Sequence, residues 1–112
     1  NVVCALAMVE NMPSGNAFKP GDVYTALNGK TVEVQNTDAE GRLILADALT
    51  YVQQNYNANL IVDMATLTGA CVVALGDFYA GLFSNNTAAR DLVVAAAEET
   101  REPVWPLPVG KR

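Results

Sequence analysis

Two carboxylates and a guanidinium are regularly spaced in one short polar stretch. Asp38 and Glu40 are two positions apart, and Arg42 follows at the same interval. In an extended backbone, side chains two residues apart point to the same side, so both carboxylates would converge on one point. Carboxylates that close repel each other unless a cation lies between them or one of them is protonated. The spacing therefore indicates a site for Mg²⁺, Mn²⁺ or Zn²⁺, bound singly or as a pair.

The neighbouring residues are compatible with a binding site and also with a purely structural turn. Gly41 lets the chain turn tightly, and Arg42 at the start of a helix would bind an anion together with nearby amides. The Asn, Thr, Asp and Gly of positions 36–41 are also typical of a solvated turn before a helix, in which an acidic residue only caps the first turn. Spacing alone does not decide between an ion-binding site and a solvated turn before a helix.

A second candidate segment, residues 65–69, follows the apolar run Leu60–Asp63. Ligands of open α/β sheets collect beyond the carboxyl ends of strands, where hydroxyl residues and glycine let a substrate approach the backbone. The candidate ligand-binding residues of this segment are Thr66, Leu67, Thr68 and Gly69. The alternative is that the threonines cap the next helix and that Gly69 permits close packing.

The composition excludes several kinds of chemistry. The 112 residues contain no histidine, which removes Ser-His-Asp and Cys-His nucleophiles and His-based zinc sites. Two cysteines make no disulfide framework, so a reducing, cytoplasmic compartment is expected. The net charge of −5 argues against nucleic-acid contact by this segment. The longest apolar run, Val2–Val9, is far too short to span a membrane, so no membrane partner is expected.

Several strands are predicted around these candidate sites. Val2–Val9 and Leu60–Asp63 are apolar runs typical of buried strands. A β-hairpin is predicted where Asn28-Gly29 lies between two runs of strand-favouring residues, Val23–Leu27 and Thr31–Val34. Asn-Gly favours a type I′ turn, in which both central residues have positive φ. Residues 78–84 are a further predicted strand.

Three helices are predicted as well. Apolar residues at three- and four-residue spacing predict a helix over 42–56, in which Asp47 is structural. Gly69 and Gly76 bracket a short helix, and Asn86 or Thr87 caps an amphipathic one. Three prolines make residues 101–112 an extended segment. The 51% hydrophobic content is enough for a core, and the order of elements predicts an α/β fold with a central mixed sheet, flanking helices and one β-hairpin.

Residues 36–43, Asn-Thr-Asp-Ala-Glu-Gly-Arg-Leu, resemble the signature of the leucine aminopeptidases, the cytosol aminopeptidases of peptidase family M17. Four flanking stretches agree in order and spacing, namely residues 10–15, 19–22, 28–30 and 65–69. The likeness covers nearly the whole chain. Residues 1–112 are therefore interpreted as part of the C-terminal catalytic domain of such an enzyme, within a larger two-metal peptidase domain.

The resemblance implies a metal-dependent hydrolase that releases N-terminal amino acids, preferably leucine, from peptide substrates. Asp38 and Glu40 would bind two divalent metal ions, zinc or manganese with magnesium as a third option, and Glu40 would bridge both. Arg42 would hold a bicarbonate ion that acts as the general base.

The same resemblance assigns roles to the second segment and to the assembly. Thr66, Leu67, Thr68 and Gly69 would line the substrate cleft, where the Leu67 carbonyl and the Gly69 amide bond to the peptide. The full-length protein would be a cytoplasmic homo-hexamer.

The family's remaining metal ligands, a lysine and two aspartates, and its second catalytic lysine belong upstream of this segment, as does its N-terminal domain. No lysine precedes Lys19 and no aspartate precedes Asp22. Because the two-metal site cannot assemble without those ligands, the 112-residue chain is expected to be inactive alone.

Two other functions are compared with this one. A non-catalytic binding or scaffold protein could have the same fold, although it would have no physical need for two adjacent carboxylates. A Mg²⁺-dependent phosphoryl-transfer enzyme would need a phosphate-cradling glycine loop, which the sequence lacks.

Overall fold

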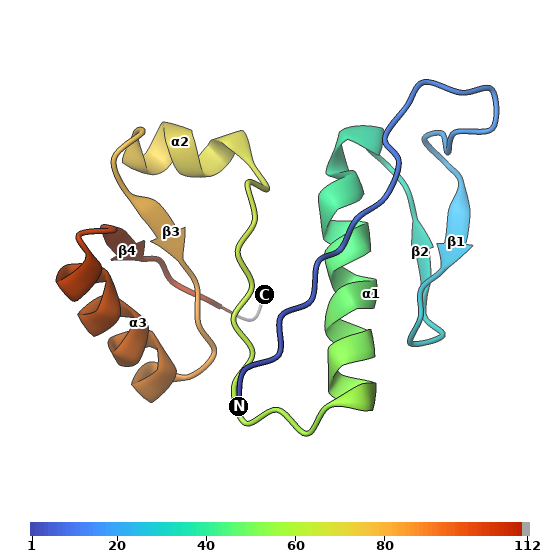
Figure 1. Cartoon of the computed structure of the whole chain (residues 1–112). Helices are drawn as coiled ribbons and strands as arrows, with labels where there is room; N and C mark the ends of the chain where they lie inside the picture. Colours follow the sequence, from blue (N-terminus) through green and yellow to red (C-terminus); the bar gives the residue numbers. More distant parts are fainter. Residues whose placement is uncertain (111–112) are drawn as a thin grey trace. The chain divides into compact units, whose positions relative to one another are not determined.

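The computed structural model describes residues 1–110 and contains both helices and strands (Figure 1). The chain divides into two compact units, one over Asn1–Leu67 and the other beginning at Thr68. Each unit contains helix and one two-stranded sheet. The predicted α/β class is therefore confirmed, with two small sheets among the described residues in place of one central sheet.

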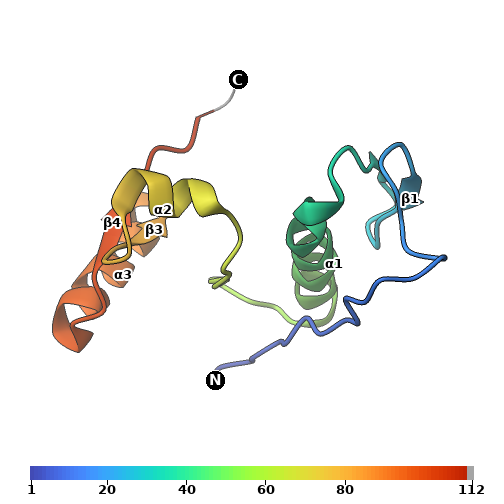
Figure 2. The ribbon, with the colours of Figure 1, turned by 90° about the horizontal axis from the view of Figure 1, so that it is seen from above.

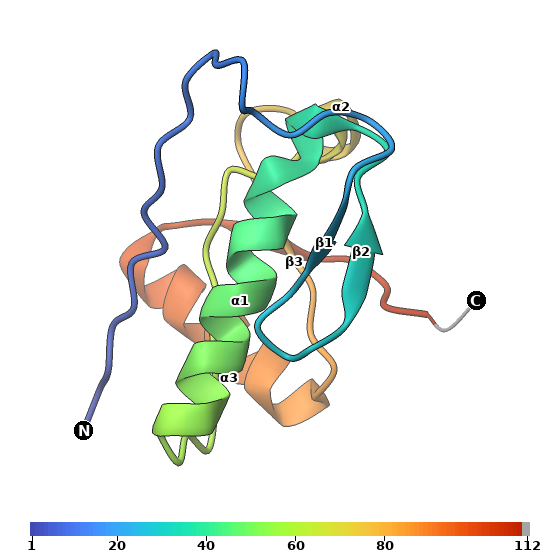
Figure 3. The ribbon, with the colours of Figure 1, turned by 90° about the vertical axis from the view of Figure 1, so that its right-hand side faces the viewer.

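The first unit contains the predicted hairpin. Strand β1 (Val23–Thr25) pairs antiparallel with strand β2 (Thr31–Glu33). The ladder is extended at its open end, where the Gly21 amide donates to the Val34 carbonyl at 2.7 Å. Figure 3 shows the hairpin lying beside a long helix, α1, of the same unit.

The hairpin turn differs from the predicted type. Gly29 has a φ of 82°, but Asn28 has no positive φ, so the type I′ prediction is wrong. The Asn28 carboxamide oxygen accepts a hydrogen bond from the Lys30 amide at 3.0 Å, and the Gly29 amide donates to the Ala26 carbonyl at 2.8 Å. These bonds give a three-residue loop that needs a left-handed residue only at its last position.

Helix α1 (Glu40–Asn55) confirms the predicted helix and begins two residues earlier than expected. Leu43 and Leu49 are half-buried, in agreement with the apolar periodicity. An Asp47 side-chain oxygen accepts a hydrogen bond from the Leu27 amide at 2.9 Å. Asp47 therefore has the predicted structural role, because it attaches the hairpin loop to the helix.

Two predicted strands of the first unit are not strands in the structure. Val2–Val9 and Leu60–Asp63 belong to no helix or sheet, and all but Ile61 are exposed. A strand exists only where a neighbouring strand accepts and donates its ladder hydrogen bonds. Neither run has such a neighbour within residues 1–110, so the hydrophobic pattern alone does not make a strand.

The second unit alternates helices with the strands of a parallel sheet. Its elements are α2 (Gly69–Leu75), β3 (Ala80–Leu82), α3 (Thr87–Thr100) and β4 (Val104–Pro106), and β3 pairs with β4 (Figure 2). The short helix, the strand after it and the amphipathic helix are confirmed. The proline-rich segment also contains a strand, which was not predicted. Pro106 is tolerated because β4 is an edge strand with one side unpaired.

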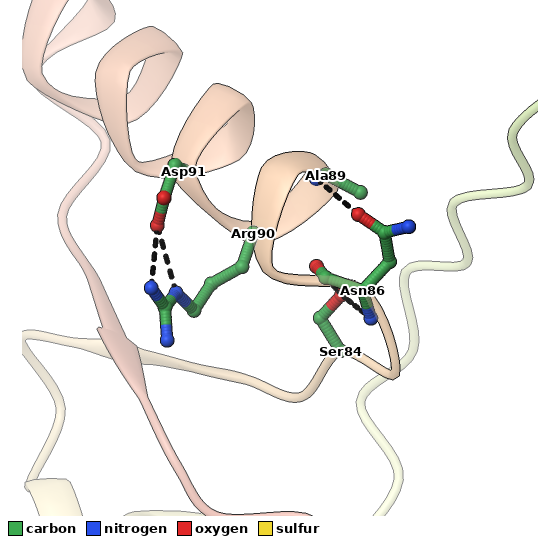
Figure 4. A network of polar contacts seen from close by, with 5 residues as sticks. All are labelled: Ser84, Asn86, Ala89, Arg90 and Asp91. Atoms are coloured by element: carbon green, nitrogen blue, oxygen red, sulfur yellow. Dashed lines mark hydrogen bonds and ion pairs between the residues drawn. The ribbon is translucent and has the colours of Figure 1, made fainter.

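The start of α3 is fixed by polar contacts shown in Figure 4. The Asn86 carboxamide oxygen accepts from the Ala89 amide at 3.0 Å, and the Ser84 hydroxyl oxygen accepts from the Asn86 amide at 3.1 Å. One turn further, Arg90 and Asp91 form an ion pair at 2.7 Å. The predicted Asn86 cap is therefore confirmed.

Few hydrophobic side chains are buried in the described part of the chain. The buried ones are Ala26, Val34 and Ala97, whereas large residues such as Val2 and Phe78 remain exposed. The apolar face of a helix or sheet is buried only when a second layer packs on it, and these small units supply little of one. The hydrophobic content therefore does not produce a sizeable core within residues 1–110. No helix in this range is long and apolar enough to cross a membrane.

Candidate metal and substrate site

The first candidate segment lies where a short 3₁₀ helix, η1 (Thr37–Ala39), runs into α1. Asn36 begins this turn, because its side-chain oxygen accepts from the Asp38 amide at 3.0 Å and its carbonyl accepts from the Ala39 amide at 3.1 Å. Asp38 is thus in the middle of η1, and Glu40 is the first residue of α1. Local hydrogen bonding by an asparagine side chain positions both acids.

The backbone at these acids is helical and not extended. Glu40 has φ −61° and ψ −37°, in the right-handed helical region, and Asp38 lies within η1. Residues two apart on a helix are about 200° apart around its axis, so they do not face each other. The expectation of an extended backbone at these acids is therefore wrong.

The charged groups of this segment have no protein partner in the described structure. Asp38 and Arg42 are exposed, and Glu40 is half-buried. The ion pairs within residues 1–110 join Lys19 to Asp22 and Arg90 to Asp91, and involve none of these three residues. The two carboxylates are hard oxygen donors that suit divalent cations.

The described residues do not form a complete metal site by themselves. Within residues 1–110, no group of three or more His, Cys, Asp or Glu side chains could hold a metal ion. Asp38 and Glu40 are therefore suitable in type but too few in number.

Arg42 is the third residue of α1, on the same first turn as Glu40. The free amides at a helix start carry partial positive charge, and a guanidinium adds a full charge at the same end. This concentration of positive charge favours a bound anion at the helix start, and the positive charges repel each other when no anion is bound. The anion-binding role of Arg42 stays a prediction.

The second candidate segment crosses the boundary between the two units. Thr66 and Leu67 end the first unit, whereas Thr68 and Gly69 begin the second. The Thr68 hydroxyl oxygen accepts from the Ala70 amide at 3.0 Å and caps α2, which Gly69 begins. The capping interpretation is therefore confirmed for Thr68. All four residues are exposed.

The structure brings Leu67 to the start of α1. A Cβ atom built on Gly41 would lie 3.0 Å from Cδ1 of Leu67, so the leucine side chain covers the helix where the glycine has no side chain. The Leu67 end of the second candidate segment thus meets the first segment inside one unit. Sequence reasoning missed this contact, and the only signal for it was a glycine inside the first helical turn.

Known proteins resemble this chain over nearly its whole length. Residues 1–112 match a family model described as the catalytic domain of the cytosol aminopeptidase family, Peptidase M17. A protein named probable cytosol aminopeptidase from Rhodopseudomonas palustris is 54% identical over 110 residues, which is 98% of this chain and 22% of that protein. One of the same name from Saccharophagus degradans is 56% identical over 109 residues, which is 97% of this chain and 22% of that protein.

A solved structure shows the same likeness in three dimensions. A mutant of tomato leucine aminopeptidase aligns with a TM-score of 0.87 and 52% sequence identity, over 91% of this chain and 20% of that one. The chain thus spans about a fifth of the length of the relatives that it matches. The family resemblance seen in residues 36–43 is confirmed, and the chain belongs to the cytosol aminopeptidase family, whose catalytic domain it matches along residues 1–112.

Proposed function

We propose that the protein is a metal-dependent aminopeptidase that hydrolyses the first peptide bond of peptides and prefers leucine at that position. The observation that carries the proposal is the match of all 112 residues to the catalytic domain of an aminopeptidase family. The acids at the start of α1 support it, because they pair with no basic side chain in the described structure and their carboxylate oxygens suit divalent cations.

Asp38 and Glu40 hold the metal ions in this proposal. Each would supply carboxylate oxygens to divalent ions, zinc or manganese with magnesium as a third option, and Glu40 would be the ligand shared by both ions, as the family resemblance implies. When bound, such ions polarise a carbonyl group and lower the pKa of a bound water. The remaining donors come from outside residues 1–112.

Arg42 binds an anion in this proposal, and bicarbonate is the anion that the family resemblance implies. The guanidinium and the helix start hold its negative charge near the acids, where it would accept the proton of the attacking water.

The backbone of the second segment orients the peptide. The Leu67 carbonyl accepts a hydrogen bond from the substrate, and the Gly69 amide donates one. Thr66 and Thr68 line the same cleft. The small side chains of this segment would let a peptide lie against the backbone.

Further proposals concern the complete protein. The family resemblance implies a homo-hexamer, and the relatives named cytosol aminopeptidases support a cytosolic location. Peptides are the proposed partners. The 112-residue chain alone is expected to be inactive, because only two of its acids are proposed metal ligands.

The test uses the complete gene product that carries residues 1–112, purified with and without a chelator. Hydrolysis of leucine p-nitroanilide that is lost on chelation and restored by Mn²⁺ or Zn²⁺ is the expected result. The same assay on the 112-residue chain should give no turnover. An absence of metal-dependent hydrolysis by the complete protein would favour the non-catalytic scaffold alternative.

A further inference from the structure

The backbone conformation at Gly41 does not require a glycine. It is the second residue of α1 and has no positive φ, so an L-amino acid could adopt its conformation without strain. Helix propensity favours alanine over glycine at such a position. A different physical reason is therefore needed for a glycine between Glu40 and Arg42.

That reason is the side chain of Leu67. Its Cδ1 atom would lie 3.0 Å from a Cβ on Gly41, which is closer than ordinary carbon–carbon contact. Leu67 would have to move by a few tenths of an ångström to admit even one methyl group. Both residues belong to the first unit, so the contact is internal to one compact body.

The contact joins the two candidate segments next to the proposed site residues of α1. Gly41 lies between a proposed metal ligand and the proposed anion-binding arginine. Leu67 lies in a segment that has no helix or strand hydrogen bonds of its own to fix it, and the residue is 42% exposed. The approach of this side chain to α1 is therefore a contact that can hold the segment in position.

We infer that Gly41 is a positioning residue, which acts by admitting the Leu67 side chain against the first turn of α1 and so sets where the substrate-binding backbone of Leu67 lies relative to Glu40 and Arg42. This inference rests on the proposed function. It assigns Gly41 no contact with substrate. The added methyl group of an alanine would displace Leu67 and weaken its carbonyl bond to the peptide.

The experiment compares three variants of the complete gene product: Gly41→Ala, Leu67→Val, and the two combined. Gly41→Ala should raise KM for leucine p-nitroanilide about tenfold, because a binding group displaced by a fraction of an ångström binds substrate poorly. In the Leu67→Val background, whose side chain is one carbon shorter, the same change should raise KM about twofold or less. Melting temperature should stay equal or rise, since alanine favours the helix.

A second readout needs no substrate. With ¹³C-labelled leucine methyl groups, the Leu67 signal is identified by its loss in Leu67→Val, and Gly41→Ala should shift it. The matched control is Gly15→Ala, where an added Cβ would meet nothing within 4 Å and φ is not positive. This control should leave KM and the Leu67 signal unchanged.

The outcomes separate the inference from the proposed function. An unshifted Leu67 signal overturns the inference, and so does a KM increase of equal size in the wild-type and Leu67→Val backgrounds. Normal KM in Gly41→Ala also overturns it while the aminopeptidase function stands. If the wild-type protein hydrolyses no aminoacyl substrate, the proposed function fails, and the methyl signal still decides whether Gly41 positions Leu67.

Discussion

The helical segments that lead into α1 and α3 both begin with Asn-Thr, but the charged residues that follow make different contacts. Each starts at an Asn-Thr pair, and in each the asparagine side chain accepts a hydrogen bond from a backbone amide of the first turn. In α3 the next charged residues, Arg90 and Asp91, pair with each other at 2.7 Å. At the start that leads into α1, Asp38 of η1 and Glu40 of α1 pair with no basic residue in the described structure.

This difference distinguishes a helix start whose polar side chains bond to one another from a helix start whose charged side chains can bind a ligand. At α3 the donors and acceptors satisfy one another within one short segment, as Figure 4 shows. At η1, which leads into α1, the Asn36 side chain accepts from the amide two residues further on, and Asp38 and Glu40 form no ion pair within residues 1–110. Asparagine caps thus precede a closed local network at α3 and unpaired acids at α1, and the residues after the cap decide which.

The largest expected effect comes from neutralising the acids of α1. Asp38→Asn or Glu40→Gln should lower kcat/KM about a thousandfold, because several kcal/mol of metal stabilisation are lost at about tenfold per 1.4 kcal/mol. Metal content by mass spectrometry should fall in parallel, with an unchanged circular dichroism spectrum. Glu33→Gln, at an exposed acid of β2, is the matched control and should keep full activity. Near-normal turnover in Asp38→Asn would contradict the ligand assignment of Asp38.

A smaller effect is expected from the arginines of the two helix starts. Arg42→Ala should lower kcat about a hundredfold, the loss typical of removing one charge-stabilising donor, and should abolish stimulation by added bicarbonate. Arg90→Ala removes a surface ion pair whose free energy is about 0–1 kcal/mol, so activity should not change. Steady-state assays with and without bicarbonate check both variants. Bicarbonate stimulation that survives in Arg42→Ala would show that another group binds the anion.

The smallest effect is expected from the caps themselves. Asn86→Ala should destabilise the start of α3 by about 1 kcal/mol, seen as about fivefold faster hydrogen exchange of the Ala89 amide, with unchanged kcat/KM. Asn36→Ala should speed exchange of the Asp38 amide to a similar extent and also lower kcat/KM, because Asp38 is a proposed ligand. Equal activity in the two variants would mean that the Asn36 cap of η1 has no catalytic consequence.

Local signals in the sequence determined much of this protein. The hairpin, helices α1 and α3, and the Asn86 cap follow from turn residues, periodicity and a capping side chain, which act over a few neighbouring residues. Residues 36–43 were sufficient to identify the family, since that stretch combines unusual residue types at fixed spacing. The site residues proposed from it are still predictions.

The tertiary structure decided what depends on partners distant in the chain or on competing local bonds. Val2–Val9 is not a strand because ladder hydrogen bonds need a neighbour, and β4 is one because β3 supplies it. The helical backbone at Asp38 goes with the hydrogen bond from its amide to the Asn36 side chain, where spacing alone had suggested an extended backbone. The approach of Leu67 to Gly41 joins residues 26 positions apart, and no local pattern encodes such a contact.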